Sequence, residues 1–152
     1  MYGIYPSPEV ERSIAIQPVM AFRTRVVYFK VVEQGATVGY DMTWAAPHQT
    51  RVVTLPVGYG DGYSRALSNR GEVLIGGRRQ PIIGRMSMDQ CSADIGEESA
   101  YNGDEVVLIG DQGDERITIE EVAEWVGTIP YEVLTMLNTR VPRHYVGAAP
   151  AM

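Results

Sequence analysis

Short β-type runs separated by glycine and proline fill the sequence up to residue 117, and helical patterns begin only after that point. The runs are rich in valine, isoleucine, threonine and aromatic residues, which favour the pleated backbone of a strand. Many short strands at this close spacing restrict the chain to a mainly β fold, either a barrel or a sandwich. The expected strands are residues 19–32, 37–42, 51–55, 72–75, 80–83, 86–95, 105–109 and 115–117.

Two of these regions carry further structural signals. Residues 19–32 present no cleanly apolar face at a period of two, which predicts a bulge or bend within this long strand. Residues 72–75 and 80–83 flank a Gly-Gly pair, an arrangement typical of a β-hairpin. Pro81 lacks a backbone N–H, so it predicts that the second arm of the hairpin is an edge strand.

Two short helices are expected near the C-terminal end. Thr118 stands three residues before Glu121, which is the spacing of a capping box, at the start of a helix over residues 119–126. Gly127 is a natural end for that helix. Residues 130–138 predict a second helix, which begins with a proline that the first turn tolerates. The two helices form an appendage to the β-barrel or sandwich.

Composition excludes several classes of partner. The chain of 152 residues is 45% hydrophobic, enough for one globular core. Its net charge is −6 and no basic stretch offsets it, so neither nucleic acid nor an anionic membrane is expected as a partner. The longest apolar runs, such as residues 106–109, are far shorter than the roughly 20 residues that span a bilayer. Cys91 stands alone, so no internal disulfide is expected and a cytoplasmic location is predicted.

The first motif with a functional interpretation is Gly58-x-Gly60-x-Gly62. Alternate glycines allow a positive φ or a close approach of the backbone to a ligand. The residues that follow lack the helix opening of a dinucleotide site, and the Gly-Lys-Ser/Thr of a P-loop is absent. These residues alone therefore favour a turn without a ligand.

The second motif is the segment Gly-Arg-Met-Ser-Met-Asp-Gln at residues 84–90. If the segment is extended, Arg85 and Asp89 lie on one face, and an ion pair on a strand is the structural interpretation. Met86 and Met88 would then point to the opposite face, where methionine more often fills a core than contacts a ligand.

No metal site is predicted. His48 and His144 have no ligand spacing to another histidine, cysteine or acid. The acidic stretch at residues 111–115 lacks the spacing of a calcium loop and predicts a solvated turn. Cys91 is expected to act as a small buried apolar residue. The nine tyrosines stand against two phenylalanines, but composition does not separate core rings from acid–base groups.

The ordered set of motifs resembles the C-terminal domain of alanine racemase, an enzyme of fold type III that depends on pyridoxal phosphate. This resemblance implies interconversion of L- and D-alanine by a homodimer, with D-alanine supplied for peptidoglycan. The matching stretches follow the family's order over nearly the whole chain, at residues 2–7, 38–40, 54–65, 84–90, 103–110, 128–132 and 140–143.

The family's motifs imply roles for seven residues. Tyr40 matches the tyrosine that acts as one of two bases, on the L-alanine face, and that serves the barrel of the partner subunit. Met88 matches a residue whose backbone N–H binds the substrate carboxylate. Tyr131 matches a tyrosine that hydrogen-bonds the cofactor phosphate. The residues that match the corridor through which substrate reaches the site are Tyr59, Arg65, Arg85 and Asp89.

The resemblance also implies that the site is incomplete in this chain. In the family, the cofactor lysine, the phosphate-binding loop and the arginine at the pyridine nitrogen lie in an N-terminal (β/α)8 barrel, which has no counterpart here. The sole lysine, Lys30, stands in a strand pattern and is expected on the surface. Residues 1–12 are expected to be a junction after the barrel, residues 13–146 the β domain, and residues 147–152 a tail.

Three hypotheses follow. The first is a racemase domain that contributes Tyr40 to a site completed elsewhere and is inactive alone. The second is a domain of a related serine or broad-specificity amino-acid racemase, because the walls of the substrate pocket lie partly in the barrel. The third is a free-standing β-barrel module that binds a ligand of its own. A chain without the barrel exposes the surface that docks it, so self-association is expected.

Overall fold

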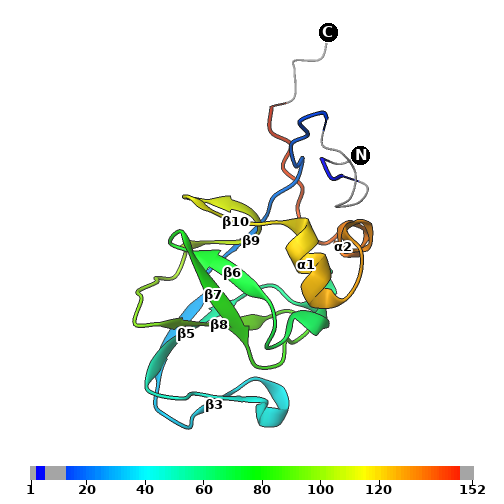
Figure 1. The fold of residues 1–152 in the computed structure, drawn as a ribbon. Coiled ribbons are helices and arrows are strands. Elements are labelled where there is room, and N and C mark those ends of the chain that lie inside the picture. Colours follow the sequence, from blue (N-terminus) through cyan, green and yellow to red (C-terminus); the bar gives the residue numbers. More distant parts are fainter. Residues whose placement is uncertain (1–2, 6–12, 148–152) are drawn as a thin grey trace.

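The computed structural model describes residues 3–5 and 13–147. Within this range an antiparallel β-sheet dominates, and two α-helices lie together beside it (Figure 1). The strands are β1 (Phe22–Arg25), β2 (Tyr28–Val32), β3 (Thr37–Val38), β4 (Trp44–Ala45), β5 (Thr50–Leu55), β6 (Glu72–Ile75), β7 (Arg78–Ile83), β8 (Cys91–Gly96), β9 (Glu105–Gln112) and β10 (Glu115–Ile117). The helices are α1 (Ile119–Val126) and α2 (Pro130–Met136), with single 3₁₀ turns η1 (Tyr40–Met42), η2 (Tyr59–Asp61) and η3 (Arg65–Leu67). The predicted mainly β fold with two C-terminal helices is confirmed. The expected junction and tail lie mostly outside the described residues.

One bent strand closes the sheet on itself. The order of hydrogen-bonded neighbours is β1-β9-β6-β7-β8-β5-β2, with β10 added on β9. The two ends of this order, β1 and β2, are separated in sequence only by Val26 and Val27. The Val26 N–H donates to the Asp104 carbonyl (2.9 Å), and the Val27 N–H donates to the Thr54 carbonyl of β5 (3.0 Å). The bend predicted within residues 19–32 is therefore the closure of a barrel.

The central strands bury both of their faces. Val53 of β5 belongs to the main core, whereas the neighbouring Val52 points to the opposite face, as the alternation of a strand requires. Val52 and Ile83 form part of a second, smaller apolar cluster. The hairpin of β3 and β4 covers this cluster and packs against it through Val38 and Trp44.

Two predicted strands are shorter than expected. Of residues 37–42, only β3 is strand, because Asp41 and Met42 adopt a left-handed backbone (φ 59° and 50°) that turns the rest into η1. Of residues 86–95, the strand β8 begins only at Cys91, and the residues before it form a loop.

The prediction that Pro81 marks an edge strand is wrong, because β7 lies between β6 and β8. Pro81 pairs with Glu72 of β6, and pairing with β8 begins one residue later, at Ile82. The missing N–H therefore falls where the strand changes partner. The solvated turn expected over residues 111–115 is confined to residues 113–114, because β9 continues to Gln112 and pairs with β10.

The hairpin turn and the helix cap agree with the sequence predictions. Gly76 and Gly77 join β6 to β7 with φ of 60° and 75°, the two positive values of a tight hairpin turn. At the start of α1, the Glu121 N–H donates to the Thr118 hydroxyl (3.2 Å), and the Thr118 N–H donates to the Glu121 carboxylate (2.7 Å). Gly127 ends the helix at φ 83°.

Arg79 ties the hairpin to this helix cap. Its guanidinium forms ion pairs with Glu72 (3.0 Å), Glu115 (3.0 Å) and Glu121 (2.9 Å). Burial raises the pKa of the Glu121 carboxyl. Hydrogen bonds from Thr118 and Arg79, together with the charge of Arg79, lower it by more, so the net pKa lies below its usual value.

Glu121→Gln should therefore destabilise the domain in a pH-dependent way. A carboxyl with a depressed folded-state pKa stabilises the fold above its unfolded pKa, about 4.3, and this contribution is lost as the pH falls through the folded value. We expect a loss of about 1 kcal/mol in the free energy of unfolding at neutral pH, shrinking as the pH falls below about 4.3. Urea unfolding at neutral and at progressively acidic pH measures this loss. The control is Glu120→Gln, an exposed neighbour in the same helical turn, and equal losses at neutral and acidic pH would contradict the prediction.

Tyr63 is a fully buried tyrosine in the main core. Its ring packs edge-on against Phe22, with centroids 6.0 Å apart and planes at 77°. Within the described residues its hydroxyl has no hydrogen-bond partner. Burial raises the pKa of this phenol well above its usual value.

Tyr63→Phe should leave the stability unchanged or raise it by up to about 1 kcal/mol, because it removes a buried hydroxyl that gains no compensating bond. Thermal unfolding of the variant measures the change, with the exposed Tyr28→Phe as the matched control. A loss above about 1 kcal/mol would show that the hydroxyl has a partner in solution.

Candidate functional site

The loop between β7 and β8, residues 84–90, is the place where most predicted site residues meet. The Ser87 N–H donates to the Gln90 carbonyl (2.8 Å), and the Gln90 N–H donates to the Ser87 hydroxyl (2.9 Å), so the loop turns instead of extending. The turn separates the two methionines, because Met86 is buried in the core and Met88 is 51% exposed. Five of the seven site residues belong to this loop or adjoin it: Arg85, Met88, Asp89, Tyr59 and Tyr40.

Tyr40 lies on a hairpin arm, residues 37–45, which comprises β3, η1 and β4. The backbone of this Tyr40 arm touches the backbone of the 84–90 loop. A Cβ on Gly39 would lie 2.7 Å from the Arg85 nitrogen, and a Cβ on Gly84 would lie 2.4 Å from a carbonyl oxygen of the arm. Both glycines also have a positive φ, so a side chain at either position would force the arm off the loop.

The turn that carries Tyr40 is strained and open to solvent. The Tyr40 side chain is 68% exposed, and no described residue bonds to its hydroxyl. The left-handed backbone at Asp41 and Met42 costs a residue with a side chain about 1–2 kcal/mol. Such strain persists only where surrounding contacts hold it, and it clusters at functional sites. One such contact is the ion pair between Asp41 and Arg85 (Nε to Oδ2, 2.9 Å).

The glycine motif at residues 58–62 supports the 84–90 loop from a second side. A Cβ on Gly58 would lie 2.3 Å from the Ser87 carbonyl oxygen. The Gly60 N–H donates to the Met88 carbonyl (2.8 Å). The close approach that these glycines allow is thus to the chain's own backbone. The Met88 N–H makes no hydrogen bond with a described residue, which leaves this donor available to an anion.

Arg85 and Asp89 do not pair with each other, contrary to the structural interpretation of their spacing. The turn within the loop directs them to different partners: Arg85 pairs with Asp41, and Asp89 pairs with Arg140. Arg140 also binds Asp61 (Nε to Oδ1, 2.7 Å), whose side chain is only 14% exposed. The two carboxylates raise the pKa of the Arg140 guanidinium.

Tyr131 and Arg65 come from two neighbouring elements. Tyr131 is half-buried in the first turn of α2. The far end of that helix is fixed to the glycine motif, because a Cβ on Gly62 would lie 1.9 Å from a carbonyl oxygen there. Arg65 is exposed at the start of η3, and Ser68 after that turn accepts a backbone N–H of the 84–90 loop (3.0 Å). No described contact joins either side chain to Tyr40.

The other candidate reactive groups do not contribute to this area. Cys91 is buried, as predicted, and burial raises the pKa of its thiol to about 12. Lys30 is exposed on β2, also as predicted. His48 and His144 are exposed, and among the described residues no group of three His, Cys, Asp or Glu side chains could hold a metal ion. None of the described helices has the length and apolar character needed to cross a membrane.

Comparison with known proteins decides the family. The sequence model described as "Alanine racemase, C-terminal domain" matches residues 19–145. This chain belongs to the alanine racemase C-terminal domain family. It is 46% identical over 147 residues to the alanine racemase of Cutibacterium acnes and 49% identical over 148 residues to that of Carboxydothermus hydrogenoformans. Each match covers 96% of this chain but only 39% and 40% of those proteins, so the chain spans about two fifths of their length.

Solved structures of alanine racemases contain the same domain. The alanine racemase from E. faecalis superposes with a TM-score of 0.91 at 35% sequence identity, and the match covers 95% of this chain and 38% of that one. The Bacillus anthracis protein with bound L-Ala-P gives a TM-score of 0.91 at 37% sequence identity, and the match covers 99% of this chain and 39% of that one. The Bartonella henselae protein with covalently bound pyridoxal phosphate gives a TM-score of 0.85 at 31% sequence identity, and the match covers 95% of this chain and 39% of that one. The predicted resemblance is confirmed.

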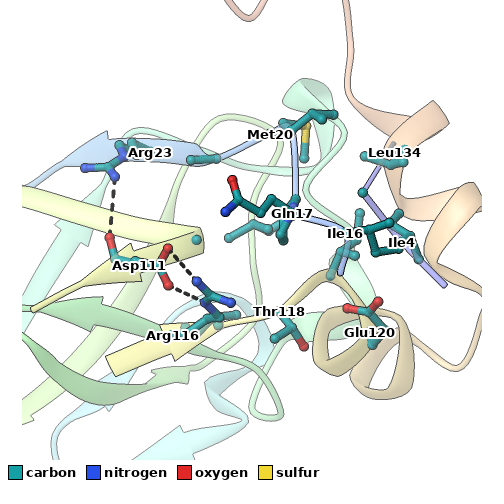
Figure 2. Close-up of a pocket in the computed structure, with 18 of the residues that line it drawn as sticks. Ile4, Ile16, Gln17, Met20, Arg23, Asp111, Arg116, Thr118, Glu120 and Leu134 are labelled. Carbon is teal, nitrogen blue, oxygen red and sulfur yellow. Dashed lines mark hydrogen bonds and ion pairs between the residues drawn. The ribbon is translucent and has the colours of Figure 1, made fainter. Parts of the chain in front are cut away.

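The racemase domain also has a cavity of about 610 Å³, away from the predicted site (Figure 2). Residues 16–21 line it together with parts of β9, β10 and α1. At its rim the Arg23 guanidinium donates to the Asp111 carbonyl (3.4 Å), and Arg116 lowers the pKa of the Asp111 carboxyl. None of the seven site residues lines this cavity. The candidate site is therefore an exposed surface outside this cavity, formed by the Tyr40 arm, the 84–90 loop and the glycine motif, and is called the rim below. A second surface must cover the rim before water is excluded from it.

Sequence reasoning gave no role to three residues that organise this rim: Asp61, Asn69 and Arg140. Arg140 and Asp61 are 79 residues apart, so only the folded chain shows that they meet. A local signal existed for Asp61, which stands three residues after Gly58 and accepts its N–H (2.9 Å).

Gly62→Ala should destabilise the domain more than Gly76→Ala. Both glycines have a positive φ (89° and 60°), so both variants carry the cost of a left-handed alanine, about 1–2 kcal/mol. Only the Gly62 variant also drives a methyl group into α2, since nothing lies within 4 Å of a Cβ at Gly76. We expect a further loss of about 2 kcal/mol or more in the free energy of unfolding. Equal losses in denaturant unfolding would show that α2 is not docked on this motif.

Proposed function

We propose that this domain supplies one half of an alanine racemase site within a longer protein that also has an N-terminal (β/α)8 barrel. Tyr40 is one of two bases and exchanges a proton with the α-carbon on the L-alanine face. The Met88 N–H binds the substrate carboxylate, and Tyr131 contacts the phosphate of pyridoxal phosphate. The substrate corridor is lined by Tyr59, Arg65, Arg85 and Asp89.

The observation that carries this proposal is that one loop, residues 84–90, positions two polar groups that have no hydrogen-bond partner among the described residues. The Tyr40 hydroxyl and the Met88 N–H make no hydrogen bond with any described residue, yet the Tyr40 arm is docked on the 84–90 loop and Met88 belongs to that loop. Their surroundings stay open: Tyr40 is 68% exposed, Met88 51% and Tyr59 48%. A strained turn and exposed apolar side chains on a rigid rim are typical of a surface that meets a ligand or another protein surface.

The division of chemical tasks follows from what the chain contains. Removal of a proton next to a carboxylate needs a base within hydrogen-bond reach, and inversion needs a second group on the opposite face. A backbone N–H on the carboxylate fixes the orientation of the substrate during both transfers. The second base is the lysine that the family carries in its barrel domain, because the sole lysine of this chain, Lys30, lies exposed on β2 outside the motifs that match the family.

The donor set fits one edge of a pyridoxal phosphate site. The Tyr131 hydroxyl is suited to donate to a phosphate oxygen, and the two arginines Arg65 and Arg85 favour anions near the rim. When bound, the cofactor takes up the electron pair left on the α-carbon. The lysine that would hold it covalently is absent from this chain. The domain thus holds the substrate and one base, and another domain holds the cofactor.

An open rim also fits a site that forms between subunits. We propose a homodimer in which Tyr40 serves the barrel of the partner subunit, and a cytoplasmic enzyme that supplies D-alanine for peptidoglycan. The isolated domain is then inactive, and its exposed apolar rim residues favour self-association.

The test is a chimera in which this chain replaces the matched part of the Cutibacterium acnes alanine racemase. We expect the chimera to interconvert L- and D-alanine, and Tyr40→Phe to lower kcat by about a hundredfold or more, because it removes a positioned base. The matched control is Tyr101→Phe, at a tyrosine of similar exposure (72%) in the segment between β8 and β9. Chiral chromatography of the products measures both directions.

Two results would contradict the proposal. One is a folded chimera that binds pyridoxal phosphate, by its absorbance, and yet does not racemise alanine. The other is an active chimera in which Tyr40→Phe and Tyr101→Phe behave alike. A chimera with higher kcat/KM for serine than for alanine would instead favour the broad-specificity racemase.

A further inference from the structure

Asn69 lies where the Tyr40 arm meets the 84–90 loop. Its side-chain amide bridges the two: Nδ2 donates to the Thr43 hydroxyl (3.0 Å), and Oδ1 accepts the Gly84 N–H (2.5 Å). Thr43 follows the turn that carries Tyr40, and Gly84 begins the loop that carries Met88. The Asn69 amide thus connects the arm that carries the proposed base, Tyr40, to the loop that carries the proposed carboxylate-binding N–H, that of Met88.

We infer that Asn69 is a positioning residue, which sets where the Tyr40 hydroxyl stands relative to the Met88 N–H. The inference rests on the function proposed above for these two groups. It adds a residue that touches neither substrate nor cofactor and acts through the arm alone.

The backbone contact between Gly39 and the 84–90 loop holds the arm just before Tyr40. The far end of the turn depends on the Asn69 amide, because the other contacts there are weak or act on the strands. The ion pair between Asp41 and Arg85 joins side chains that are 67% and 39% exposed, so solvent screens it. Apolar packing of Val38 and Trp44 holds the two strands of the arm, not the turn between them. Asp41 and Met42 are not glycines, so their left-handed backbone is unfavourable by itself and persists only where surrounding contacts hold it. The hydrogen bond to Thr43 acts directly at the end of this turn.

A simpler reason for an asparagine at this position is its backbone. Asn69 has a φ of 57°, and asparagine tolerates the left-handed region better than most residues. Two substitutions separate the explanations. Asn69→Gly keeps the backbone conformation and deletes the amide. Asn69→Asp keeps an acceptor for Gly84, and the Thr43 hydroxyl is free to rotate and donate to the carboxylate.

The first measurement is hydrogen exchange on the chain itself, followed by mass spectrometry. We expect Asn69→Gly to speed amide exchange in residues 37–45 by about tenfold or more, because the arm opens more often. Exchange in residues 72–83 should not change, and Asn69→Asp should resemble the wild type. Unchanged exchange of the arm in Asn69→Gly would overturn the inference, whatever the activity.

The second measurement is the kinetics of the chimera. Asn69→Gly should lower kcat for L-alanine by about tenfold or more, since a base displaced by about 1 Å loses much of its effect. KM should change by less than about threefold, because the carboxylate site at Met88 keeps its own support. Thr43→Val should reproduce the loss, and Thr43→Ser and Asn69→Asp should restore activity.

The outcomes separate this inference from the proposed function. If the arm loosens and kcat stays unchanged while Tyr40→Phe inactivates the chimera, Asn69 is only structural and the proposed function stands. If Tyr40→Phe is harmless, the proposed function fails and takes the positioning role with it. Loosening of the arm together with a fall in kcat and rescue by Asn69→Asp supports the inference.

Discussion

The closure of the sheet by the bend between β1 and β2 is the constraint on which the rest of this domain depends. One continuous segment pairs with β9 on one side and with β5 on the other, so neither sheet end is left as a free edge. Closure makes β5 a central strand whose second face also needs cover. The chain leaves β2, turns at Gly35 and returns as the β3–β4 hairpin over that face. The Tyr40 arm is therefore held in place by the architecture of the barrel, and its outer turn is the part left free for other contacts.

Glycine contacts set the geometry of the rim more than polar networks do. Gly39 and Gly84 bring the arm against the 84–90 loop, and Gly58 brings the glycine motif against the same loop from another side. Contacts between backbones are insensitive to side-chain rotation, so they fix distances more tightly than the exposed ion pairs around them. The motif that resembled a ligand-binding loop thus serves a structural purpose at its glycines, while Tyr59 between two of them is 48% exposed.

The parts of this fold that depend on neighbours in sequence were predictable. The capping box at Thr118 and the Gly-Gly hairpin are local, and both appear as expected. The 84–90 loop was mistaken for a strand because its composition suits one, while the Ser87 side chain offers the backbone a competing set of hydrogen bonds. The left-handed turn at Asp41 carries no glycine to announce it. The family resemblance supplied roles for seven residues, but the pairing of Arg140 with Asp61 depends on contacts that no local pattern encodes.

An open, strained rim has a physical reason in a domain of this kind. If Tyr40 is to act on a substrate held by another surface, the outer face of its arm must stay free of contacts from its own domain. The forces that hold the turn must then come from the inner face, where, among the described residues, the 84–90 loop and Asn69 contact it. Exposed charges on that face are weak anchors in water. The backbone contacts at Gly39 and Gly84 and the Asn69 amide, which bonds to both the arm and the loop, hold the arm from its inner face. They leave the side chain of Tyr40 unobstructed.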